Sequence, residues 1–205
     1  MIYDSYDDEE KNREFFELLL FFLLKTYNEN TALFISEIYF KILMDAINNN
    51  NYKNLENIQK LIKSNPDKAV LEIKKIGETI SNEYLNDSTL NIYRAWLLEV
   101  MEKIKFNYID DKENYLNNRL QDIISSIMSY SYLQDAIAQG YTHKKWLTME
   151  DSRVRPAHRQ IDRSVIPISE PFVNSSGSIQ YPHDAEASMD NTVNCRCTLQ
   201  FIKSD

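Results

Sequence analysis

A chain of 205 residues, 43% hydrophobic and 26% charged, is long enough for one sizeable core or for a helical part with a small second domain. Its net charge of −8 arises entirely before Tyr141, and this acidic body argues against broad DNA binding driven by Lys and Arg. The most apolar stretch, residues 15–24, has about half of the ~20 apolar residues that span a bilayer, so the sequence predicts no membrane association.

Helical periodicity dominates the first 140 residues. Apolar side chains recur at spacings of three and four, the pattern of an amphipathic helix with a wide apolar face. Asn65 and Pro66 favour a helix start, and Gly140 favours a helix end. In chain order, the sequence predicts helices around 15–23, over 31–48, around 55–62, from 66 to about 84, from a cap at Ser88 or Thr89 through 104, and over about 111–138. Together they predict a bundle whose Phe, Tyr and Ile side chains form the core.

Shorter elements are expected after Gly140, about four strands in all. The predicted elements are a strand over 143–149 anchored by Trp146, a short helix over 151–161 capped by Asp151 or Ser152, and strands over 178–181 and 196–202. The fold class is therefore α+β. A mainly α-helical N-terminal bundle forms a domain over 1–140, and a small α+β module follows over 141–205. A module of this size often needs a staple.

The two cysteines of the chain motivate a metal hypothesis for that staple. Cys195 and Cys197 stand one residue apart, which makes a disulfide between them geometrically difficult and favours a reduced, intracellular setting. As thiolates, together with His158 and His183, they would give the two-sulfur, two-nitrogen set that suits tetrahedral zinc. The alternative is that the thiols are small buried apolar groups and His158 is a hydrogen-bonded core histidine. Elemental analysis of the purified protein distinguishes the two.

An enzymatic role is an alternative for the same region. His158 would act as a general base if Asp151 or Asp162 oriented it, because all three share one face of the predicted helix with Arg155. Cys195 would then be a candidate nucleophile. Such Asp–Arg–His sets are more often structural ion-pair networks, so the sequence predicts no enzyme.

Nucleic-acid binding is a further alternative, because six basic side chains fall within twenty consecutive residues of this region. The candidate phosphate contacts are Lys144, Lys145, Arg153, Arg155, Arg159 and Arg163. This local cluster contrasts with the acidic body that precedes it.

An ordered series of residues in this region resembles a known family. The series runs Lys-x-Trp-x-Thr, Asp-x-Arg-x-Arg, His, Asp, Pro-Phe, Pro-x-Asp and Asn-Cys-Arg-Cys. In this chain its members are Lys144 or Lys145, Trp146, Thr148, Asp151, Arg153, Arg155, His158, Asp162, Phe172, Pro182, Asp184, Asn194, Cys195, Arg196 and Cys197. Over about residues 143–199 the chain resembles the Mu F-type phage minor head proteins, also called phage head morphogenesis proteins. It departs from them at Arg163 and His183, where the family usually has glycine, and the second departure weakens His183 as a metal ligand.

The resemblance implies a structural component of a tailed-phage or prophage head. Proteins of this family associate with the portal and affect DNA packaging or delivery. The expected partners are therefore the portal protein and capsid or scaffold proteins, with DNA and further copies of the chain as additional candidates. The implied location is the virion, inside the head, and the host cytoplasm during assembly. The resemblance carries over no catalytic residue, and no cofactor other than zinc is expected.

Overall fold

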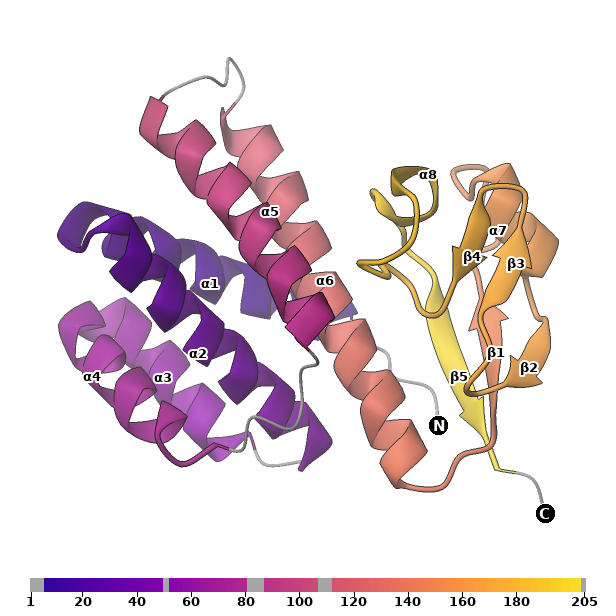
Figure 1. The fold of residues 1–205 in the computed structure, drawn as a ribbon, viewed down its shortest axis with the longest axis horizontal. Coiled ribbons are helices and arrows are strands. Elements are labelled where there is room, and N and C mark those ends of the chain that lie inside the picture. Colours follow the sequence, from indigo (N-terminus) through magenta and orange to yellow (C-terminus); the bar gives the residue numbers. More distant parts are fainter. Residues whose placement is uncertain (1–5, 50–51, 81–86, 107–111, 204–205) are drawn as a thin grey trace.

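Helices make up most of this protein. The computed structural model describes residues 6–49, 52–80, 87–106 and 112–203 (Figure 1). Within these ranges no helix combines the length and the apolar character that crossing a membrane requires. The helices that precede the first strand are α1 (Tyr6–Thr26), α2 (Glu29–Asn48), α3 (Lys53–Ser64), α4 (Pro66–Gly77), α5 (Asp87–Phe106) and α6 (Lys112–Ala138).

The six helices correspond to those that periodicity predicts, with differences at their ends. The Asn65 side chain accepts a hydrogen bond from the Lys68 amide at 3.1 Å, which confirms the predicted start of α4. The predicted end of α4 is wrong, because the helix stops at Gly77; position 84 lies outside the described residues. At Gly77 an added Cβ would come within 2.5 Å of Ile38 Cγ2, so glycine permits close packing of α4 on α2.

The start of α5 also differs from the prediction. The helix begins at Asp87, so Ser88 and Thr89 lie inside it and neither is its cap. Boundary differences of one or two residues are common at helix ends.

The bundle core is built mainly from aromatic and aliphatic side chains of α1, α2 and α6. Phe16 of α1 is fully buried, with its ring centroid 5.8 Å from that of Tyr39 and 4.7 Å from that of Phe40, both on α2. These rings confirm the predicted aromatic core. In Figure 1, α5 and α6 lie between the first four helices and the strands. The bundle therefore presents α5 and α6 to the C-terminal segment.

Two small antiparallel sheets follow the bundle in the described part of the chain. Strand β1 is central in the sheet order β2-β1-β5, and β3 pairs with β4 in a separate hairpin. The elements are β1 (His143–Leu147), α7 (Pro156–Ile161), β2 (Val165–Pro167), β3 (Phe172–Asn174), β4 (Gly177–Ile179), α8 (Met189–Thr192) and β5 (Thr198–Ile202). The α+β class is thus confirmed, whereas the expected number of about four strands is one too low.

The predicted helix over 151–161 is wrong in its first half. The Asp151 side chain accepts a hydrogen bond from the Arg153 amide at 3.0 Å, which forms a local turn instead of a helical cap. Helix α7 begins only at Pro156, and Arg155 occupies the cap position. Proline suits this first turn because its missing N–H would have no partner there.

Candidate metal centre

His158 enters the module interior from the short helix α7. This six-residue helix directs Ala157, His158 and Ile161 inward, and the His158 side chain is only 1% exposed. The ring of Trp146, a fully buried residue of β1, lies 5.2 Å from the His158 ring in an edge-to-face arrangement. Trp146 packs in the same way against Phe172 of β3, at 5.3 Å. His158 therefore lies in an apolar, aromatic environment with a fixed ring orientation.

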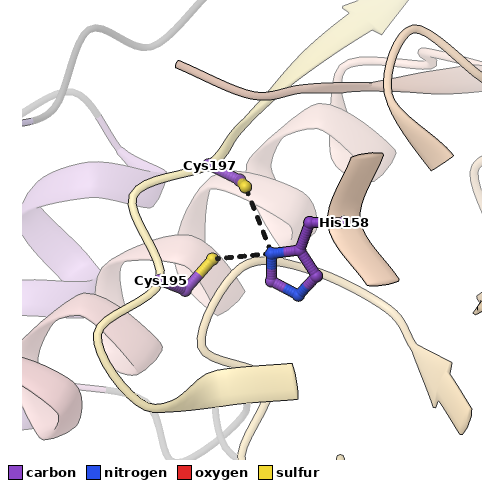
Figure 2. Close-up of side chains that lie close together, drawn as sticks. All are labelled: His158, Cys195 and Cys197. Atoms are coloured by element: carbon purple, nitrogen blue, oxygen red, sulfur yellow. Dashed lines mark hydrogen bonds between the residues drawn. The ribbon is translucent and has the colours of Figure 1, made fainter. Parts of the chain in front are cut away.

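The two cysteines approach the same nitrogen of His158. They follow α8 and Asn194, whose left-handed φ of 53° turns the chain back toward α7. The His158 Nδ1 atom lies 3.7 Å from the Cys195 Sγ and 3.3 Å from the Cys197 Sγ, as Figure 2 shows. One ligand atom from each of the three residues lies within 4.8 Å of the others. The structure thus brings together three of the four predicted metal ligands.

These distances fit a tetrahedral metal ion. Bonds of about 2.3 Å to sulfur and about 2.0 Å to nitrogen place the two ligand atoms about 3.5 Å apart around a tetrahedral centre. The observed separations of 3.3 and 3.7 Å bracket that value. Two sulfurs and one imidazole nitrogen also form a donor set that zinc prefers. Both cysteines are free thiols, so both are available as ligands.

The electrostatics of the two thiols differ. A hydrogen bond from Cys197, together with His158, holds the pKa of the Cys195 thiol well below its usual range despite burial. The pKa of Cys197 is raised, because it shares a proton with Cys195 and is itself buried. The two thiols therefore titrate as a pair, and the thiolate is the form that binds metals.

Arg196 points away from this group and fixes the opposite side of the segment. Its guanidinium donates to both carboxylate oxygens of Asp151, at 2.8 and 2.9 Å. This hydrogen bond is the main reason why the pKa of Asp151 is lowered to about 2. Asp162 accepts the Thr148 amide hydrogen at 2.9 Å. Both carboxylates that were candidates to orient His158 are thus engaged elsewhere, and the predicted common helix face is wrong because α7 begins at Pro156.

The six basic side chains proposed for nucleic-acid contact do not form one exposed surface. Lys144 is fully buried, its ammonium group donates to the backbone and side-chain oxygens of Gln180, and burial lowers its pKa to about 8. Arg155 donates to the carbonyl oxygens of residues 190 and 193. The others are Arg153, paired with Asp151; Arg163, paired with Glu150; Arg159, which donates to the Ser152 carbonyl; and Lys145, half-buried in β1 opposite Gln200.

His183 lies beside the three-residue group but faces other partners. Its Nε2 lies 2.5 Å from the Cys195 carbonyl oxygen, and its Nδ1 lies 3.3 Å from Oδ1 of Asp122, a residue of α6. The Asn194 amide donates to the same oxygen of Asp122, also at 3.3 Å. The sequence analysis missed Asp122. The sequence feature that could have indicated Asp122 is an acidic residue placed directly before the apolar run Ile123-Ile124, on the face that α6 buries.

The comparisons with known proteins place this arrangement in a family. The model of the family described as phage Mu protein F like protein matches residues 94–200, slightly more than half of the chain. The match begins inside α5 and ends in β5, so it includes α6, the three-residue group and Asp122. No curated protein and no solved structure matches the chain. The chain belongs to the family of phage Mu protein F like proteins.

Proposed function

We propose that this protein is a minor head protein of a tailed phage or prophage and acts in head morphogenesis. The family match over residues 94–200 carries the proposal, because this family suggests such a role. Its location would be the interior of the phage head, reached by assembly in the host cytoplasm. Its partners there would be the portal protein and the capsid or scaffold proteins.

The helical bundle offers apolar side chains for docking on the portal. Phe34 of α2 is 56% exposed and Leu71 of α4 is 67% exposed, and Phe21 of α1 is also exposed. Large exposed apolar groups supply contact area without strong salt dependence. Docking through the bundle would leave the module as a rigid projection.

Co-expression with the portal protein encoded by the same phage or prophage tests this role. A tagged full-length chain should retain the portal protein after washing at low and at high salt. Phe34→Asp should weaken this association, whereas Val173→Asp, at a 70% exposed position of the module, should leave it unchanged. Failure of the wild-type chain to retain the portal protein would refute the docking role.

We also propose that zinc is the ion held by His158, Cys195 and Cys197. The two nitrogen–sulfur distances and the donor set support this choice. Bound zinc would supply a staple that joins α7 to the segment before β5. Elemental analysis of the purified protein should find one zinc per chain, and Cys197→Ser should reduce it strongly. A metal-free wild-type protein would contradict the proposal.

The contacts of the basic side chains favour the structural role over nucleic-acid binding. Lys144 is buried and Arg155 donates to two backbone carbonyls, so both side chains already have partners within the chain. DNA affinity that fell steeply between low and moderate salt would instead favour the nucleic-acid alternative. An enzymatic role is disfavoured in the same way, because His158 faces two sulfurs while Asp151 and Asp162 bind other groups.

A further inference from the structure

Helix α6 reaches the cysteine segment through one buried carboxylate. Asp122 lies on α6, is 6% exposed and contacts residues of the C-terminal segment. Its Oδ1 atom accepts the Asn194 amide hydrogen and lies 3.3 Å from Nδ1 of His183. A single oxygen atom of the bundle therefore contacts two residues of the C-terminal segment, more than sixty positions later in the chain.

His183 extends this contact to the first cysteine. Its ring is 5% exposed, and its Nε2 lies 2.5 Å from the carbonyl oxygen of Cys195. Asp122 thus braces the backbone immediately before Cys195 through Asn194, and His183 braces the backbone of Cys195 itself. Neither contact involves a sulfur atom, so both leave the thiols free to face His158.

Two residues that take part in these contacts have an unfavourable backbone conformation. Asn194 has φ 53° and His183 has φ 59°, both in the left-handed region that non-glycine residues seldom occupy. Such conformations persist where surrounding contacts determine them. Asp122 contacts both residues, and this gives the carboxylate a role that packing alone would not require.

We propose that Asp122 and His183 are positioning residues for the metal centre. They hold the Cys195–Cys197 segment at the distance from His158 at which two sulfurs and one nitrogen can bind a single ion. The inference rests on the proposed zinc site. Groups that orient metal ligands from outside the coordination sphere typically contribute 10- to 100-fold to metal affinity, and we expect the same range here.

Cobalt(II) titration of the metal-free full-length protein tests this role, because thiolate-bound cobalt absorbs visible and near-ultraviolet light. Asp122→Asn and His183→Ala should each weaken cobalt binding by about 10- to 100-fold and alter the thiolate-to-cobalt absorption. Asp135→Asn is the matched control, since Asp135 lies on the same helix, thirteen residues or about 20 Å of helical rise beyond Asp122, is 8% exposed and accepts a hydrogen bond from Gln139 at 2.7 Å. It should bind cobalt as the wild type does.

The outcomes separate the two proposals. If the wild type binds cobalt through its thiolates and both variants bind it equally well, the positioning role is wrong and the metal site remains. If the wild type shows no thiolate-bound cobalt, the metal site itself is wrong and the positioning role fails with it. Circular dichroism identifies a variant that fails to fold. For Asp122→Asn, faster hydrogen exchange of the Asn194 amide in folded protein is a second expected result, and unchanged exchange would contradict the proposed brace.

Discussion

Replacement of Trp146 by alanine should destabilise the module more than any surface substitution. Trp146 is fully buried, and its ring packs edge-to-face on His158 at 5.2 Å and on Phe172 at 5.3 Å. Truncation of a buried tryptophan to alanine costs about 3–5 kcal/mol, because apolar contacts are lost and a cavity remains. For a chain of this size each kcal/mol corresponds to about 2–4 °C, so the melting temperature should fall by roughly 6–20 °C.

Thermal unfolding followed by circular dichroism measures this effect. Met149→Ala is a suitable control, because Met149 lies two residues after the end of β1 and is 60% exposed. The control should change stability by no more than about 0.5 kcal/mol. A loss of less than about 1 kcal/mol for Trp146→Ala would show that the two aromatic contacts do not hold β1 to α7 and to β3.

Three further predictions concern charge and close packing. Arg196 holds the pKa of Asp151 at about 2, below its ordinary 3.8, so the ion pair stabilises the fold above about pH 4. In urea unfolding, the stability difference between the wild type and Asp151→Asn should therefore narrow as the pH falls from 4 toward 2. A difference that stayed constant over this range would contradict the stabilising role of the ion pair. Burial lowers the pKa of Lys144 from 10.5 to about 8, so between these pH values the unfolded chain binds more protons than the folded chain. The stability of the wild type relative to Lys144→Met should therefore rise as the pH increases from 8 to 10.5. A stability difference that did not change with pH would contradict the lowered pKa of Lys144. Gly77→Ala places a Cβ within 2.5 Å of Ile38 Cγ2 and should cost about 1–3 kcal/mol in urea unfolding, with partial recovery in the double variant with Ile38→Val.

Local patterns were sufficient to predict the helices and part of the site. Helical periodicity depends on neighbours within one or two turns, so α1–α6 could be predicted without knowledge of their packing. The proximity of His158, Cys195 and Cys197 could be predicted from their chemistry, because two thiols and a histidine in a small module suggest a stabilising metal site. The structure confirms that these three residues lie together.

Long-range contacts explain what the sequence analysis missed. Asp122 and Asn194 lie 72 positions apart, and nothing in either local pattern indicates that they meet. Lys144 was a candidate phosphate contact, a role that needs an exposed side chain, yet it is fully buried. A signal was nevertheless present: Lys144 stands two residues before Trp146 in a strand, so both side chains lie on the same face. Knowledge that β1 is the central strand would have predicted its burial.

The two-sided character of residues 195–197 limits how this segment can evolve. Cys195 and Cys197 face His158, while Arg196 between them binds Asp151. Insertion of a single residue would produce the Cys-x-x-Cys spacing that is more usual in zinc proteins, yet it would turn one thiol toward Asp151 or the guanidinium toward His158. Homologous chains should therefore tolerate length changes in the β3–β4 turn far more readily than between these two cysteines.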